Sequence, residues 1–113
     1  MTTALDTSML LDILVDDPTY ASVSESALSK ARSKGSLVVC EAVIAELRPA
    51  FSSDKELSQF LNDVGIDYLP STKECALLAG SIFSSYLKNK DKAKRVLPDF
   101  LIAAHAMINA ESC

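Results

Sequence analysis

Short apolar runs alternate with longer segments of helical periodicity along this chain, and that alternation restricts the possible folds more than any other feature. The runs 3–6 and 37–40 are separated by a segment, 20–33, in which apolar residues recur at helical spacing. Such alternation is typical of α/β proteins with a parallel sheet. Only three glycines occur in the chain, which disfavours a fold of strands and tight turns. The sequence therefore predicts an α/β fold with a parallel sheet.

Local signals place the boundaries of the expected elements. Ser53 and Glu56 form a capping-box pattern that opens one helix, and Gly65 is placed to end it. Ser71 and Glu74 form a second such pattern. Pro98 suits the first turn of the last helix, which is apolar almost all round and is expected to be central and buried. The expected strands are 3–6, 37–40 and 66–69, and the expected helices are 7–14, 20–33, 41–50, 54–64, 71–87 and 99–110.

The composition indicates one domain in a reducing compartment. Cys40, Cys75 and Cys113 are far apart and form no zinc-binding pair, so we expect reduced thiols. Asp6 and Asp12 interrupt the first apolar run, which excludes a signal peptide. No uninterrupted apolar segment approaches the roughly 18 residues of a membrane span. We expect a cytoplasmic protein without a membrane partner.

Charge restricts the function less strongly. The formal net charge of -4 is mild evidence against a protein that coats nucleic acid non-specifically. It permits a nuclease, because such an enzyme gathers acids around a metal and keeps its basic residues in a local patch.

Three carboxylates stand out by their positions. Asp6 closes the first predicted strand, Glu46 has mostly apolar neighbours, and Asp99 begins the last predicted helix. In a parallel sheet, the carboxyl ends of strands and nearby helix starts meet at one edge, where these acids are expected to converge. No Lys or Arg is spaced regularly to pair with each of them. Oxygen ligands of this kind suit Mg²⁺ or Mn²⁺, so the sequence predicts a metal site.

Each acid alone also has a structural explanation. Asp6 suits a turn or a helix cap, Asp99 suits the dipole of its helix, and Glu46 suits an exposed helical position. The intervals of 40 and 53 residues form no local motif. The apolar contexts of all three together favour a shared site.

The residues around the acids resemble the PIN-domain family, and within it the bacterial VapC-type toxins. The matching stretches, which follow the family's order and separation, are 5–8 (Leu-Asp-Thr-Ser), 43–51 (Val-Ile-Ala-Glu-Leu-Arg-Pro-Ala-Phe) and 97–106 (Leu-Pro-Asp-Phe-Leu-Ile-Ala-Ala-His-Ala). The resemblance implies a three-layer α/β/α PIN-like fold with a central parallel sheet over residues 1–113.

The same resemblance implies an activity and partners. Asp6, Glu46 and Asp99 would bind Mg²⁺ (or Mn²⁺) and form the catalytic site, with Ser8 as a supporting hydroxyl beside Asp6. The implied activity is Mg²⁺-dependent cleavage of RNA by the toxin of a type II toxin–antitoxin system. The implied partners are a cognate antitoxin and a second copy of the chain in a homodimer.

The sequence departs from the family pattern at its end. The family continues with a strand and a fourth acid in a Leu-Thr-x-Asp type segment, and this sequence stops before it. The expectation is a PIN-like domain truncated at the C-terminus that lacks the final strands.

Other residues leave alternatives open. The basic stretch 88–95 guides RNA towards Asp99 or is a solvated loop. Arg48 contacts phosphate or pairs with an acid. His105 lies about 240° around its helix from Asp99, which favours a packed or hydrogen-bonded histidine over a general base.

Two other functions compete with the nuclease. One is an inactive PIN-fold module that binds an antitoxin or another partner. The other is a receiver-type signalling domain, which needs adjacent acids after the first strand, a phosphoacceptor Asp after the third and a late Lys. Here Thr7 and Ser8 follow Asp6, the third predicted strand ends at Leu69, and no Lys follows Lys94.

Overall fold

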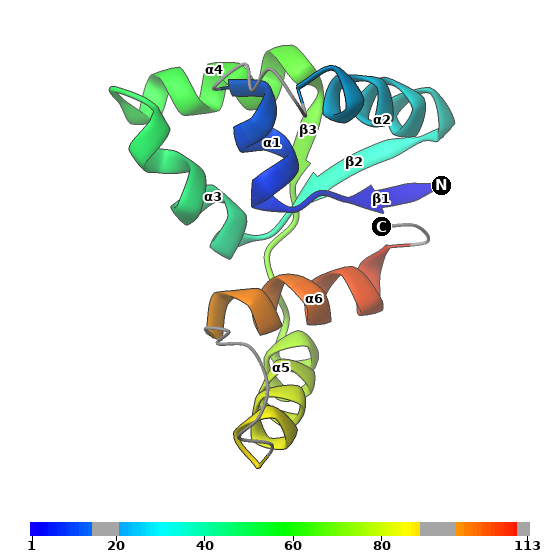
Figure 1. The fold of residues 1–113 in the computed structure, drawn as a ribbon, viewed down its shortest axis with the longest axis vertical. Helices are drawn as coiled ribbons and strands as arrows, with labels where there is room; N and C mark the ends of the chain where they lie inside the picture. Colours follow the sequence, from blue (N-terminus) through cyan, green and yellow to red (C-terminus); the bar gives the residue numbers. More distant parts are fainter. Residues whose placement is uncertain (15–20, 89–96, 111–113) are drawn as a thin grey trace.

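A parallel sheet lies at the centre of the upper part of the molecule (Figure 1). The structure is a computed structural model that describes residues 1–14, 21–88 and 97–110. The strands are β1 (Thr2–Ala4), β2 (Ser36–Val39) and β3 (Ile66–Tyr68). They are ordered β1-β2-β3, and Thr3 pairs with Leu37 while Leu37 pairs with Ile66. The predicted α/β class with a parallel sheet is confirmed.

Helices connect the strands close to the predicted positions. They are α1 (Thr7–Leu14), α2 (Ala21–Lys34), α3 (Glu41–Leu47), the 3₁₀ turn η1 (Arg48–Ala50), α4 (Asp54–Val64), α5 (Lys73–Leu87) and α6 (Leu97–Asn109). The helix predicted over 41–50 is divided, because α3 ends at Leu47 and η1 follows. Pro49 explains the change, since it has no backbone N–H to donate within an α-helix. Pro98 lies in the first turn of α6, as predicted.

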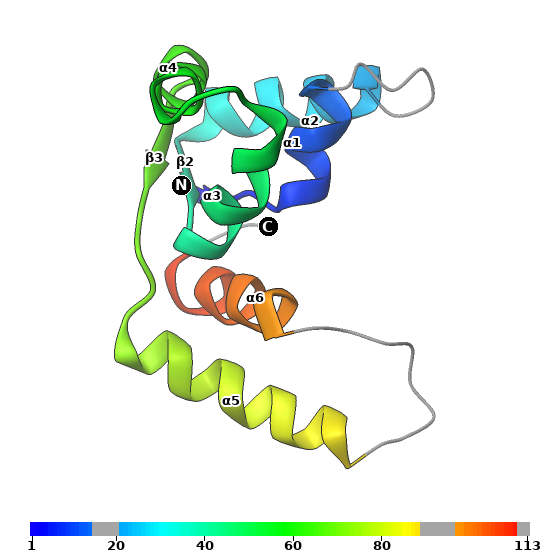
Figure 2. The same cartoon turned by 90° about the vertical axis from the view of Figure 1, so that its left-hand side faces the viewer.

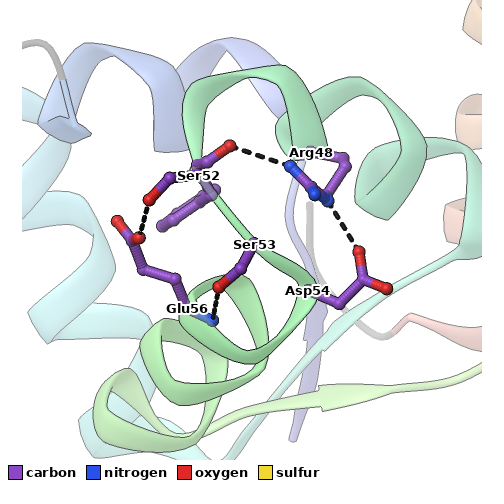
Figure 3. Close-up of polar contacts among 6 residues, drawn as sticks. Arg48, Ser52, Ser53, Asp54 and Glu56 are labelled. Carbon is purple, nitrogen blue, oxygen red and sulfur yellow. Dashed lines mark hydrogen bonds and ion pairs between the residues drawn. The ribbon is translucent and has the colours of Figure 1, made fainter.

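The ends of α4 follow from local chemistry. Ser53 is the N-cap, and its Oγ accepts a hydrogen bond from the backbone N–H of Glu56 over 3.1 Å (Figure 3). The Glu56 carboxylate accepts from the hydroxyl of Ser52. Gly65 ends the helix in a left-handed conformation, with φ of 80°, which glycine adopts without strain. The predicted limits of this helix are confirmed.

The predicted cap of α5 is wrong by one residue. Thr72 is the N-cap, and its Oγ1 accepts from the backbone N–H of Cys75 over 3.3 Å. The backbone N–H of Ser71 donates instead to Glu41 Oε1 over 2.9 Å. This contact with α3 holds Ser71 in the loop, so the next hydroxyl caps the helix.

Aliphatic side chains fill the main core. Leu37 and Val39 of β2 are buried against Leu10 of α1 and Val43 and Leu47 of α3. A second cluster joins α5 to α6 through Ala79, Phe100 and Ala104. Helix α6 is therefore held partly by α5 and partly by the main core.

Helices lie on both sides of β1, in agreement with the predicted three layers. Helices α1 and α2 lie above β1 and α6 lies below it, and the view turned by 90° shows the same arrangement (Figures 1 and 2). Contacts of α2 with β2 and of α6 with β1 support it. The carboxyl end of β1 thus opens between α1 and α6.

Helix α6 was predicted to be central and buried, but only one side of it is buried. Phe100, Ala104 and Ala106 are buried, whereas Leu97 is 46% exposed and Met107 is 64% exposed. An apolar sequence therefore shows that a helix can be buried, but it does not show which of its sides are buried. Within the described part of the chain, no helix combines the length and apolar character that crossing a membrane requires.

Candidate functional site

An open cavity of about 800 Å³ lies alongside β1, and we call it the β1 cleft. Its walls come from β1, the start of α1, one face of α2, and α6, together with Glu46 of α3. Because β1 and β2 run parallel, α1 and α3 both begin at the same edge of the sheet. Segments distant in sequence therefore contribute side chains to one depression.

The three predicted carboxylates all line the β1 cleft. Asp6 follows β1, Glu46 lies in the last turn of α3, and Asp99 lies in the first turn of α6. Asp6 and Glu46 are exposed, and Asp99 is half-buried. Ser8, the predicted supporting hydroxyl, lines the same cleft.

Asp6 also caps α1. Its Oδ1 accepts from the backbone N–H of Met9 over 3.0 Å and from Ser8 Oγ over 3.3 Å. The side chain of Leu5, one residue earlier, is buried in the main core. The cap and this buried neighbour hold the Asp6 carboxylate in the wall of the cleft, so the capping and ligand roles are compatible.

Glu46 is tied to the start of α1. Its Oε1 accepts a hydrogen bond from Thr7 Oγ1 over 2.6 Å. Leu47, the next residue, is completely buried. The backbone of α3 is thus fixed by the core, while the exposed carboxylate is held by a hydroxyl from another helix.

Asp99 is placed by the packing of α6. Phe100, the next residue, is buried between α5 and α6, where its ring centroid lies 5.3 Å from that of Phe83. A carboxylate in the first turn of a helix is also favoured by the helix dipole. The position of Asp99 therefore depends on how α6 docks.

The donor chemistry of these residues fits a hard divalent cation, since carboxylate oxygens are the ligands that Mg²⁺ and Mn²⁺ prefer. However, no group of three His, Cys, Asp or Glu side chains in residues 1–14, 21–88 and 97–110 stands ready to hold a metal ion. The three acids share a cleft without forming a preassembled ligand cluster.

Two lysines of the cleft were missed by sequence reasoning. Lys30 and Lys34 lie one turn apart on α2, on the face that also brings Ala27 and Ala31 into the cleft. Their spacing of four residues could have shown that both lysines lie on one face of a helix. Sequence alone did not show that this face lines the same cleft as the three acids.

The basic residues that the sequence analysis singled out, Arg48 and the stretch 88–95, do not line the cleft where the structure describes them. Arg48 pairs with an acid, because its Nε donates to Asp54 Oδ1 over 2.7 Å and its Nη1 donates to the carbonyl oxygen of Phe51 over 2.8 Å (Figure 3). Lys88 is exposed at the end of α5. The rest of the basic stretch, 89–95, lies outside the described residues.

His105 has the packed, hydrogen-bonded role that the sequence favours. It is 2% exposed, and its Nε2 lies 2.6 Å from the carbonyl oxygen of Leu69. Nearby, burial acts to raise the pKa of the Glu41 carboxyl. Hydrogen bonds from Ser71 and from the Glu41 backbone, with the charge of His105, outweigh burial and hold that pKa below its usual value.

The two described cysteines do not line the cleft. Cys40 and Cys75 are buried free thiols, in agreement with the predicted reduced state. Burial raises the pKa of the Cys40 thiol, which disfavours the reactive thiolate. Cys113 lies outside the described residues.

Comparisons with known proteins agree with the fold. The sequence model of the PIN domain matches residues 3–112. A similar solved structure is that of VapBC2 from Rickettsia felis bound to a DNA fragment from their promoter. The likeness has a TM-score of 0.69 and 16% identity, and covers 94% of this chain and 80% of that one. No curated protein matches the sequence. These matches argue against the receiver-domain alternative.

Proposed function

Because the chain belongs to the PIN-domain family, we propose that it is a Mg²⁺-dependent endoribonuclease and the toxin of a type II toxin–antitoxin system. PIN domains are generally nucleases, and the proposal specifies the metal, the substrate and the biological role. The observation that carries it is the shared position of Asp6, Glu46 and Asp99 in the β1 cleft. These residues are separated by 40 and 53 positions in the sequence, and the fold brings them to one cleft.

The cation would be held by Asp6, Glu46 and Asp99. When bound, Mg²⁺ or Mn²⁺ activates water and stabilises negative charge on a scissile phosphate. The chain's own hydroxyls hold the acids, since Ser8 donates to Asp6 and Thr7 donates to Glu46. These two bonds restrain the carboxylates in the wall of the cleft.

Lys30 and Lys34 supply the positive charge for the RNA backbone. Both lie in the wall of the cleft that α2 forms. Phosphate contacts position a nucleic acid without reading its sequence, and single lysines serve as point charges for them. A strand in the cleft would thus be held by α2 while one phosphate lies at the acids.

Cleavage of RNA by the purified protein in the presence of Mg²⁺ tests the enzymatic part. We expect Asp6→Asn, Glu46→Gln and Asp99→Asn each to abolish cleavage while far-UV circular dichroism stays unchanged. Asp67→Asn is the matched control, because Asp67 is an exposed acid of β3 that does not line the cleft. A folded wild-type protein that cuts no RNA with either Mg²⁺ or Mn²⁺ overturns this part.

The toxin part is supported by the likeness to the solved structure of VapBC2. We expect a small antitoxin encoded beside this chain to copurify with it and to suppress cleavage. Light scattering of the purified protein is expected to give the mass of a homodimer. An adjacent protein that neither binds nor inhibits the chain contradicts this part and leaves the nuclease intact.

An inactive PIN-fold module is the second candidate. It is favoured by the lack of a preassembled metal cluster among the described residues. Binding of the antitoxin without cleavage of RNA by the wild-type protein would select it.

A further inference from the structure

Two consecutive hydroxyls at the start of α1 donate to two different carboxylates of the β1 cleft. Ser8 Oγ donates to Asp6 Oδ1, which is two residues away. Thr7 Oγ1 donates to Glu46 Oε1, which is 39 residues away on α3. The Thr7 contact is the shorter, at 2.6 Å against 3.3 Å. The first bond is local, whereas the second joins two elements of the cleft.

The two partners of the long-range bond differ in rigidity. Thr7 is half-buried and β-branched, so few rotamers of its side chain are open to it. It lies between Leu5 and Leu10, which are both buried in the main core. Glu46 is exposed, and its longer side chain has more freedom to lose. A rigid donor therefore restrains a flexible acceptor.

This hydrogen bond leaves coordination sites on the carboxylate. An ionised glutamate has about four lone-pair positions on its two oxygens, and the Thr7 hydroxyl occupies one of them on Oε1. Glu46 can thus be bound by Thr7 and a cation at the same time.

We infer that Thr7 is a positioning residue, which holds Glu46 in the β1 cleft and raises the affinity of the site for a divalent cation. The inference rests on the proposed function, because that function assigns Glu46 to the metal. Thr7 acts through Glu46 and touches neither the cation nor the RNA. Hydrogen-bond partners of metal ligands typically contribute about 10- to 100-fold to metal affinity.

Calorimetric titration of the purified protein with Mn²⁺ tests the inference without relying on activity. Thr7→Val removes the hydroxyl but keeps the shape and a similar helix propensity. We expect Thr7→Val to weaken Mn²⁺ binding by about 10-fold or more. Thr7→Ser retains the donor and should restore most of the affinity. Cleavage assays of the same variants should show a matching rise in the Mg²⁺ concentration for half-maximal rate.

A double-mutant cycle separates positioning from a general loss of stability. If Thr7 acts through Glu46, then adding Thr7→Val to Glu46→Gln changes Mn²⁺ affinity no further. The matched control is Thr72→Val, which removes the capping hydroxyl of α5 away from the cleft. This control should lower the urea midpoint and leave Mn²⁺ affinity unchanged.

The outcomes distinguish the two proposals. Equal Mn²⁺ affinity of wild type and Thr7→Val overturns the role of Thr7 alone, and so does an undiminished effect of Thr7→Val in the Glu46→Gln background. Mn²⁺ binding that depends on Thr7, with no cleavage of RNA, supports this inference and overturns the enzymatic proposal. A wild-type protein that binds no Mn²⁺ overturns both.

Discussion

The Nε2 atom of His105 lies 2.6 Å from the backbone carbonyl oxygen of Leu69. His105 belongs to α6, which carries Asp99, and Leu69 lies in the segment that leads from β3 to α5. Asn109, one turn further along α6, donates from Nδ2 to Cys75 Sγ of α5 over 3.6 Å. The helix that delivers one acid to the cleft is therefore attached by polar contacts as well as by the cluster around Phe100.

Replacement of His105 should loosen that attachment. His105→Leu leaves the Leu69 carbonyl without its partner in a part-buried position, so we expect unfolding to become easier by about 1–3 kcal/mol. Urea denaturation measures the change. Met107→Ala on the exposed side of α6 is the control, expected to stay within about 0.5 kcal/mol of wild type. Equal stability of His105→Leu and the wild type would contradict the attachment.

Two glycines give opposite predictions for the same substitution. At Gly35 an added Cβ would lie 1.9 Å from the Met1 carbonyl oxygen, which accepts the hydrogen bond from the backbone N–H of Ser36. Gly35→Ala should therefore destabilise by about 1–3 kcal/mol or more. At Gly80 of α5 nothing lies within 4 Å, so Gly80→Ala should stabilise by roughly 0.5–1 kcal/mol. Thermal unfolding of both variants checks the pair, and a stabilised Gly35→Ala protein would refute the close approach.

The lowered pKa of Glu41 predicts how the stability of the fold changes with pH. Despite the opposing effect of burial, its hydrogen bonds with Ser71 and its own backbone lower the pKa of the folded carboxyl below the ordinary 4.5. A lowered pKa stabilises the fold above the unfolded-state pKa, and this contribution disappears as the pH falls through the folded-state pKa. Glu41→Gln should thus be less stable than wild type at neutral pH and lose less stability below about pH 4.5. Parallel pH profiles of the two proteins in urea would refute the prediction.

The lysines of α2 predict a change in the salt dependence of RNA binding. Each phosphate contact on single-stranded RNA contributes about 0.7 to the slope of log K against log salt concentration. Lys30→Ala combined with Lys34→Ala should reduce the slope by about 1.4. The measurement uses Asp99→Asn protein, so that the RNA stays whole. Lys55→Ala combined with Lys73→Ala, outside the cleft, should leave the slope unchanged, and equal slopes for both pairs would exclude the α2 contact.

Much of the fold was predictable because its signals are local. The left-handed turn at Gly65 and the Ser53 cap depend on residues within one helical turn, so the limits of α4 follow from the sequence. Asp6, Glu46 and Asp99 could also be identified as candidate site residues from their immediate sequence neighbours.

What the sequence by itself determined is the set of strands and helices, the α/β class and the candidate acids, since each depends on propensity and pattern over a few residues. Tertiary structure alone decided that Ser71 is held by Glu41, leaving Thr72 to cap α5. It also decided that Lys30 of α2 lines the same cleft as the acids, and that Thr7 donates to Glu46. These contacts join residues far apart in the chain. They form when the helices dock on the sheet. The spacing of residues within one helix does not determine which neighbouring element each side of that helix faces.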